Sequence, residues 1–212
     1  MKHQAVFFDF DGVILDTFDL KTQAFRDMFA SFGPEIQARV VEHHLLHGGI
    51  SRLEKFRFYY RDILQKPVSE NEIRKLGDKF VELTMKGVLT APFIPGAFEA
   101  LSELKREEKP AFVVSGIPQE ELLGILEKRD LLGFFKEAHG SPRHKPAIIR
   151  DILTRKGYNP AECLFLGDAT TDYDAAKVCG LKFLGIVKKG KPSLFPPKTM
   201  TSERVLLQGA PV

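Results

Sequence analysis

Long apolar runs are missing from this sequence of 212 residues. A helix that spans a bilayer needs about 18–20 consecutive apolar residues, and no stretch approaches that length. The first apolar run, residues 5–8, is interrupted at once by Asp9 and Asp11, so it lacks the architecture of a secretory signal peptide. We therefore expect a cytoplasmic protein without a membrane partner.

Cysteine is also scarce. The two cysteines, Cys163 and Cys179, do not have the spacing of metal ligands. Because disulfides are rare in the cytoplasm, we expect both side chains to be buried, reduced thiols.

A strong excess of charge of one sign is absent. The net charge is +3 and the basic residues are spread along the chain, which is too weak a signal to indicate nucleic-acid binding. Aromatic residues lie beside Arg57 and Arg61, but the buried face of an amphipathic helix explains them without a partner. We expect no nucleic-acid partner, whereas a small anionic substrate is compatible with the mildly basic charge.

Short β-prone apolar runs alternate with segments of helical spacing through most of the chain. Such alternation is typical of a parallel sheet with helices on both faces. The expected strands are residues 5–8, 111–114, 163–166 and 183–187, with a last edge strand at 205–207. The expected helices are residues 97–108, 119–128, 145–156 and 173–178, and the expected surface loop is 188–199.

One long segment departs from this alternation because it shows helical spacing and almost no strand signal. Ser69 and Glu72 have the pattern of a capping box, and Ser51 has that of an N-cap. The helices expected in this segment are residues 20–32, 51–64 and 69–88. The predicted fold is therefore α/β, with a Rossmann-like parallel-sheet core (residues 1–16 and 91–212) and an inserted all-helical cap domain (residues 17–90).

Polar side chains stand where three of the expected strands end, and ligands of open α/β sheets bind outside the carboxyl ends of the strands. A lysine that opens a helix after a loop can join them at this edge. Carboxylate oxygens are ligands for Mg²⁺, while a lysine and a hydroxyl group hold phosphoryl oxygens. The residues are Asp9 and Asp11, Ser115, Asp168 and Asp172, with Lys145 as the lysine.

These residues lie in four motifs that resemble those of the haloacid dehalogenase-like superfamily. Residues 9–16, DFDGVILD, match the first motif, DxDGxxxD after an apolar strand. Ser115 matches the second motif and Lys145-Pro146 the third. Residues 167–180 match the fourth, GDxxxDxxAAxxxG. The helical insertion between the first two motifs makes the chain similar to the branch of phosphoglycolate phosphatase and β-phosphoglucomutase.

The resemblance implies a Mg²⁺-dependent phosphatase that acts on a small phosphorylated metabolite. Asp9 would be the nucleophile that forms an aspartyl phosphate, and Asp11 the general acid and base. Dehalogenases and phosphonate-cleaving members lack an aspartate at the position of Asp11, so its presence favours phosphate esters. Phosphoglycolate, sugar phosphates, nucleotides and nonulosonate precursors all suit a cap of this type.

The same resemblance assigns the remaining site residues. The ligands implied for the metal ion are Asp9, the backbone carbonyl of Asp11, Asp168 and Asp172, the last either as a direct ligand or behind one. The residues implied for binding the substrate are Ser115 and Lys145, with Gly12 and Gly116 beside them.

Two departures bear on the branch. Lys21 stands where the mutases usually have a histidine, and Gly167 where they have an acidic residue. Both favour plain hydrolysis over the alternative of a phosphomutase. A non-catalytic module that retains the fold is a further alternative, which the loss of Asp9, Asp11, Lys145 or Asp168 would have favoured.

The segment from Gly48 to Arg52 resembles the specificity loop of the mutase branch. Arg52 is therefore either a substrate-binding residue or an exposed arginine after a helix–helix turn. Of three nearby histidines, two share a helix face at i and i+3, but nothing supplies a third ligand at a recognised spacing, so we expect a solvated or cap-interface face rather than a metal site. These are His43, His44 and His47.

Overall fold

The computed structural model describes residues 3–207, and its centre is a sheet of six strands in the order β3-β2-β1-β4-β5-β6. Every neighbouring pair is parallel. The strand order reverses between β1 and β4, which is where open sheets of this kind bind ligands. The strands are β1 (Ala5–Phe8), β2 (Ala111–Pro118), β3 (Glu137–Ser141), β4 (Cys163–Gly167), β5 (Lys182–Ile186) and β6 (Thr201–Ser202).

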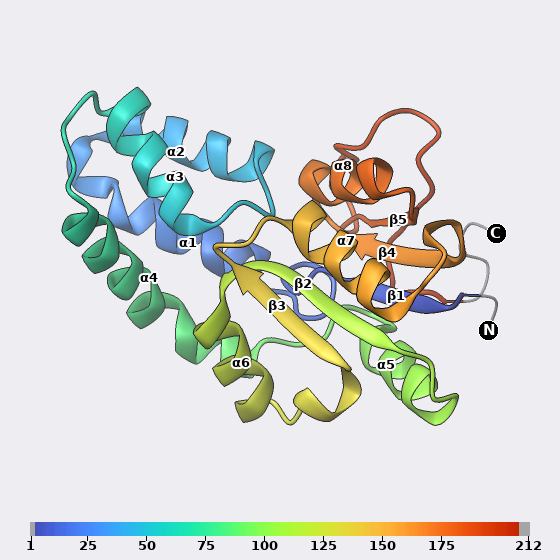
Figure 1. Cartoon of the computed structure of the whole chain (residues 1–212). Helices are drawn as coiled ribbons and strands as arrows, with labels where there is room; N and C mark the ends of the chain where they lie inside the picture. The colour runs from blue at the N-terminus through green and yellow to red at the C-terminus, as the bar shows by residue number, and fades with distance from the viewer. Residues whose placement is uncertain (1–2, 208–212) are drawn as a thin grey trace.

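Helices cover both faces of the sheet because its strands alternate their side chains between two apolar clusters. In β1, Ala5 and Phe7 pack with α7 and α8, while Val6 and Phe8 pack with α5 and α6. Figure 1 shows these helices around the sheet. The α/β prediction is thereby confirmed. The four helices are α5 (Ala97–Arg106), α6 (Gln119–Lys128), α7 (Lys145–Lys156) and α8 (Thr170–Cys179).

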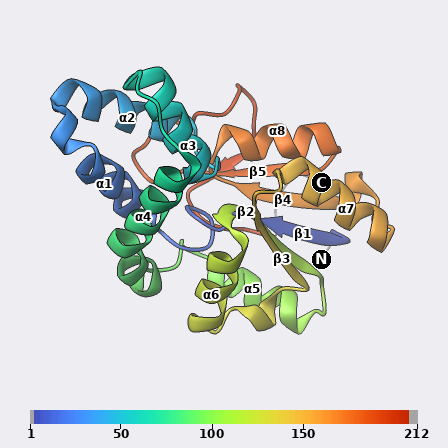
Figure 2. The same ribbon diagram turned by 60° about the vertical axis from the view of Figure 1, so that its left-hand side comes forward.

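A separate group of helices lies between β1 and β2 in the chain and packs around its own cluster of buried side chains, which includes Phe25, Phe56 and Phe80. We call this group the cap. The strands of the sheet point towards it (Figure 2), so the cap stands over their carboxyl ends. Its main helices are α1 (Phe18–Met28), α2 (Pro34–Leu46), α3 (Arg52–Phe58) and α4 (Glu70–Thr90), with a π-helical turn at Tyr59–Ile63.

The helix starts in the cap follow the predictions in part. The capping box of Ser69 and Glu72 is formed: the Glu72 amide donates to Ser69 Oγ, and the Ser69 amide donates to a Glu72 carboxylate oxygen. Ser51 does occupy the N-cap position of α3, but its side chain makes no capping hydrogen bond. Exact boundaries of the cap at residues 17 and 90 remain a prediction.

The sheet differs from the prediction at two strands. The expected edge strand at 205–207 is wrong, because the last strand is β6 and the Val205 amide donates instead to the Pro95 carbonyl at 2.8 Å. Val205 and Leu207 are apolar because they are buried against the core, not because they pair in the sheet. Strand β3 was missed, since its residues, EAHGS, have little β propensity.

Cys163 and Cys179 are buried free thiols, as predicted. Within residues 3–207, none of the helices combines the length and the apolar character needed to cross a membrane.

Candidate active site

The first motif forms a tight turn at the end of β1. The Asp9 amide donates to the Leu166 carbonyl of β4 at 2.9 Å, which fixes Asp9 at the carboxyl edge of the sheet. Gly12 has a φ of +72°, and a Cβ there would lie less than 3.0 Å from Asp168 Oδ2. Only glycine fits this position, since it both accepts a positive φ and leaves room for Asp168.

Lys145 joins the separate strand ends. Its Nζ lies 2.9 Å from Asp9 Oδ2 and 2.5 Å from Asp172 Oδ1, and all three side chains are buried. Burial disfavours the charge of Lys145, but the carboxylates of Asp172 and Asp9 outweigh it and raise the pKa of Lys145 above its usual value. Lys145 therefore stays protonated and holds the two aspartates in place.

The acidic residues form a cluster suited to a cation. One carboxylate oxygen from each of Asp9, Asp168 and Asp172 lies within 4.8 Å of the others. Burial raises the pKa of Asp9 to about 7, with Asp172 and Asp11 adding repulsion against the attraction of Lys145. Burial and repulsion from Asp9 also raise the pKa of Asp168. A metal ion between these oxygens would remove that penalty, so the residues fit the ion that the motifs imply.

Packing against Asp172 explains why position 167 is a glycine, which the sequence did not reveal. A Cβ at Gly167 would lie less than 3.0 Å from the Asp172 side chain. Asp172 itself is fully buried, with Oδ1 accepting from Lys145 and Oδ2 from the Ala169 amide at 3.1 Å. A larger residue at position 167 would displace Asp172 and, through it, Lys145.

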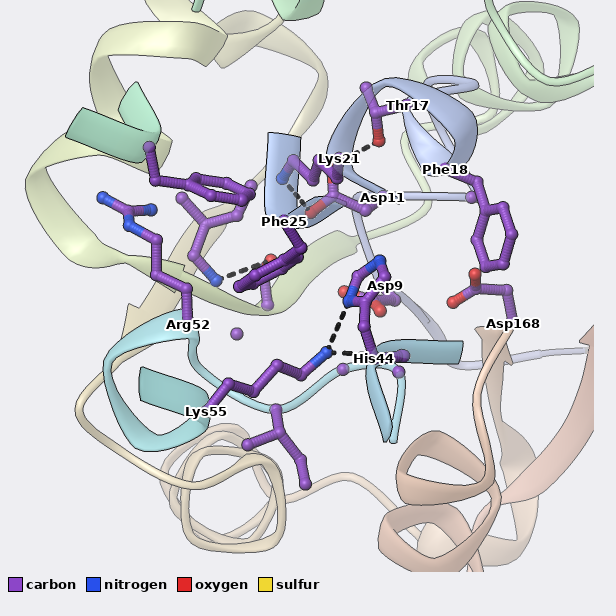
Figure 3. A pocket seen from close by; sticks show the side chains of 18 residues that line it. Asp9, Asp11, Thr17, Phe18, Lys21, Phe25, His44, Arg52, Lys55 and Asp168 are labelled. Carbon is purple, nitrogen blue, oxygen red and sulfur yellow. Dashed lines mark hydrogen bonds and ion pairs between the residues drawn. The ribbon is translucent and has the colours of Figure 1, made fainter. Parts of the chain in front are cut away.

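Asp11 is held by the beginning of the cap. Thr17 Oγ1 donates to Asp11 Oδ1 at 2.6 Å, and Lys21 Nζ donates to Asp11 Oδ2 at 2.5 Å (Figure 3). Thr17 was not among the predicted site residues. Because both carboxylate oxygens of Asp11 are bonded to the cap side, its orientation depends on where the cap stands.

The Gly-rich turn of the cap closes directly on the core. Thr171 Oγ1 donates to the Gly48 carbonyl at 2.8 Å. A Cβ at Gly116 would lie less than 3.0 Å from the Gly49 carbonyl oxygen, so these two backbones touch beside Ser115. Ser115 is 1% exposed, and its Oγ accepts from the Ile117 amide at 3.2 Å. The predicted substrate-binding residues Ser115 and Gly116 are thus covered by the cap.

A cavity remains between cap and core, lined by the predicted residues Asp9, Asp11, Gly12, Ser115, Gly116, Asp168 and Arg52. Arg52 is not the exposed arginine of the second interpretation, since only 11% of its side chain is accessible. Its guanidinium pairs with Glu121 of α6 and lies 5.6 Å from the centre of the Phe80 ring. Its Nε–H has no partner among the described residues. Its role towards the substrate stays a prediction.

The expectation of a solvated or cap-interface face is confirmed in part, since His47 is exposed and His44 lines the cavity between cap and core. His43 stacks on Phe58 with ring centres 4.1 Å apart, and His44 packs on Phe25 at 4.6 Å. Burial lowers the pKa of His43 to about 4 and that of His44 to about 2. Both imidazoles are therefore neutral parts of the cap interior.

The structure also places in this cavity a cation that sequence reasoning missed, Lys55. Its side chain is buried, and Nζ lies 2.9 Å from His44 Nδ1 (Figure 3). The only available signal was its position three residues after Arg52, which places both on one face of α3.

Comparison with known proteins agrees with this geometry. A family model described as haloacid dehalogenase-like hydrolase matches residues 6–186. The chain is 27% identical over 183 residues to phosphoglycolate phosphatase 1 of Pseudomonas aeruginosa, covering 84% of this chain and 66% of that one. It is 26% identical over 196 residues to a phosphorylated carbohydrates phosphatase of Thermotoga maritima, covering 87% and 85%.

A solved structure has the same fold. β-Phosphoglucomutase from Clostridium difficile superposes with a TM-score of 0.72 at 21% identity, over 88% of this chain and 85% of that one. The family match covers most of the present sequence, including all four motifs and the helices between the first two. The chain belongs to the haloacid dehalogenase-like hydrolase family.

Proposed function

We propose that this protein is a Mg²⁺-dependent phosphatase that hydrolyses a small phosphate monoester through a phosphoaspartate at Asp9. The observation that carries the proposal is the arrangement of buried Asp9 and Lys145 beside half-buried Asp168 at the carboxyl ends of parallel strands, under a helical cap. Relatives named as phosphatases of phosphoglycolate and of phosphorylated carbohydrates support the same reaction class.

Asp9 is the nucleophile. One of its carboxylate oxygens attacks phosphorus in line with the ester oxygen, which leaves as the bond to phosphorus breaks. Its Oδ1 accepts from the Phe10 amide at 2.7 Å and its Oδ2 pairs with Lys145, so the carboxylate is oriented before the substrate arrives. Ser115 and Lys145 hold the phosphoryl oxygens, with the backbones of Gly12 and Gly116 close by.

Asp9, Asp168 and the backbone carbonyl of Asp11 would hold Mg²⁺, which offsets the repulsion between a carboxylate and an anionic phosphoryl group. Both oxygens of Asp172 already accept hydrogen bonds, from Lys145 and from the Ala169 amide. Asp172 is also fully buried and, unlike Asp9 and Asp168, does not line the cavity. We therefore assign Asp172 the task of holding Lys145 behind the site, in preference to direct ligation.

Asp11 moves the protons. In the first step it gives a proton to the departing ester oxygen, and in the second it takes one from the water that attacks the phosphoaspartate. That water breaks the bond between phosphorus and Asp9 and releases inorganic phosphate. The ammonium of Lys21, 2.5 Å from Asp11 Oδ2, stabilises the negative charge that Asp11 needs to accept the proton from water.

The test is a phosphatase assay with and without Mg²⁺, on p-nitrophenyl phosphate and on a panel of phosphorylated metabolites. We expect Mg²⁺-dependent release of inorganic phosphate that excess chelator abolishes. Ca²⁺ should substitute poorly, because it takes more ligands at longer distances and misplaces the attacking oxygen. Full activity in excess chelator, or none under any metal, would contradict the proposal.

A further inference from the structure

Lys55 stands out among the buried charges because it has no acidic partner. Lys145 pairs with Asp9 and Asp172, and Arg52 pairs with Glu121. Among residues 3–207, by contrast, no carboxylate oxygen lies within 4.0 Å of Lys55 Nζ. Its partners within this range are Nδ1 and the carbonyl oxygen of His44, at 2.9 and 3.5 Å.

An unpaired buried ammonium is costly to the fold. The Lys55 side chain is 3% exposed, and burial, with repulsion from Lys21, outweighs the distant attraction of Asp168 and Asp11 and lowers the pKa of Lys55 to about 7. Removing a charge from water without a counter-ion disfavours the charged form. A charged residue in such a position stabilises the fold less than an apolar side chain of the same size would. We therefore look for a role of Lys55 in binding rather than in stability.

The surroundings of Lys55 indicate what it receives. It lines the same cavity as the catalytic Asp9 and Asp11, but it does so from the cap. Phe25 and Phe80 form apolar walls of that cavity, and the Phe25 ring centre is 5.7 Å from Lys55 Nζ. The core residues already account for the phosphoryl group, so the cap side is left for the leaving group.

His44 completes a pair of donors. As a neutral imidazole that accepts from Lys55 at Nδ1, it carries its proton on Nε2. That Nε2 is buried and has no hydrogen-bond partner among the described residues. His44 also lines the cavity. A cation and a free N–H donor together match an anionic acceptor group.

We propose that Lys55, with His44, binds a second anionic group on the leaving-group side of the substrate, so that the enzyme prefers monoesters whose alcohol carries a carboxylate or a phosphate. This inference rests on the proposed phosphatase function. It assigns to Lys55 the missing counter-ion: the substrate supplies the negative charge that the protein does not.

Three esters of two-carbon alcohols test which group on the alcohol Lys55 binds. The probes are 2-phosphoglycolate, with a carboxylate; ethylene glycol bisphosphate, with a second phosphate; and 2-hydroxyethyl phosphate, with a neutral hydroxyl. Lys55→Met removes the charge at nearly constant volume. Lys75→Met, at an exposed position of α4, is the matched control.

We expect the wild-type enzyme to prefer at least one anionic probe, and the better one identifies the group that Lys55 reads. Lys55→Met should lower kcat/KM for that probe, relative to 2-hydroxyethyl phosphate, about 10- to 100-fold, the range for a hydrogen bond to a charged group. Lys75→Met should leave this ratio unchanged. Because Lys55→Met removes an unpaired buried charge, its melting temperature should equal or exceed that of wild type.

An unchanged ratio in Lys55→Met would overturn the inference. Equal losses on all probes together with a lower melting temperature would also overturn it, since Lys55 would then only tether α3 to His44 of α2. If wild type hydrolysed none of the esters, and neither p-nitrophenyl phosphate nor the metabolite panel with any metal, the proposed function would fail separately. Binding of the three probes would then be measured by calorimetry with the Asp9→Asn variant. Tighter binding of an anionic probe, lost when Lys55→Met is added, supports the inference. Equal binding of all three probes refutes it.

Discussion

Substitution of Gly49 tests whether turnover requires the cap to close as it does in this structure. Gly49 has a φ of +73°, and a Cβ there would lie less than 3.0 Å from Thr171 Oγ1 and 3.1 Å from Lys145 Nζ. Both neighbours belong to the core, so Gly49→Ala penalises the closed state specifically. Overpacking of this kind costs about 1–3 kcal/mol. If only the closed state reacts, kcat/KM falls about 5- to 100-fold.

Gly33→Ala is the matched control. Gly33 also belongs to the cap and has a φ of +92°, but nothing lies within 4 Å of the position that its Cβ would take. Alanine there meets backbone strain of at least similar size, without contact with the core. Steady-state kinetics and thermal melts of both variants separate the two effects: Gly33→Ala should lower the melting temperature and leave kcat/KM near that of wild type.

A second substitution sharpens the test. Thr171→Ala alone removes the hydrogen bond to the Gly48 carbonyl and should lower kcat/KM about 2- to 10-fold. In the Gly49→Ala background the same change removes the obstructing Oγ1, so it should restore part of the lost activity. A requirement for this closed state is refuted if Gly49→Ala loses no more kcat/KM than Gly33→Ala. It is also refuted if Thr171→Ala lowers kcat/KM by the same factor in Gly49→Ala as in wild type.

Three further predictions follow from the same geometry. Arg52→Ala should raise KM for an anionic substrate about 10- to 100-fold with little effect on p-nitrophenyl phosphate; equal losses would mean that its pair with Glu121 matters only for cap closure. With a hexose 1-phosphate, inorganic phosphate should appear without the 6-phosphate, because Lys21 bonds Asp11 where the mutases have histidine; a dominant isomerised product would reverse this. The pKa of Asp9 is raised from an ordinary 3.8 to about 7 in the metal-free fold. Between these two pH values the folded protein keeps a proton on Asp9 that the unfolded chain has lost, so the stability of the metal-free protein falls as pH rises from about 4 to about 7. Mg²⁺ should therefore raise the melting temperature more at pH 8 than at pH 5.5; an equal rise, or a larger one at pH 5.5, would contradict the acidic cluster as its site.

Much of the fold and of the core site could be predicted because local signals carry them. Asp9, Asp11 and Asp168 follow apolar strands, and parallel strands bring their carboxyl ends to one edge whatever lies between them in the chain. The turn at Gly12 demands a residue that tolerates positive φ, and the glycine of the first motif supplies it. Strand β3 escaped because its side chains are small or polar, and its pairing depends on β2.

The cap side of the site could not be predicted, since it depends on packing between distant segments. Arg52 and Glu121 meet only because the first turns of α3 and α6 come together, and no periodicity encodes that pair. His44 is buried by Phe25 of a different helix, which composition alone cannot show. The sequence around Lys55 does not distinguish it from an ordinary surface lysine. Its burial and its lack of an acidic partner are visible only in the structure.

The most direct test of Asp9 as the nucleophile is chemical trapping of the phosphoaspartate. The enzyme is mixed with substrate and Mg²⁺, quenched during turnover and treated with borohydride, which reduces an aspartyl phosphate to homoserine. We predict homoserine at position 9 by mass spectrometry, dependent on both substrate and Mg²⁺ and absent from Asp9→Asn. Phosphate release without any modification at Asp9, or with the modification at another residue, would contradict the assignment of Asp9 as the nucleophile.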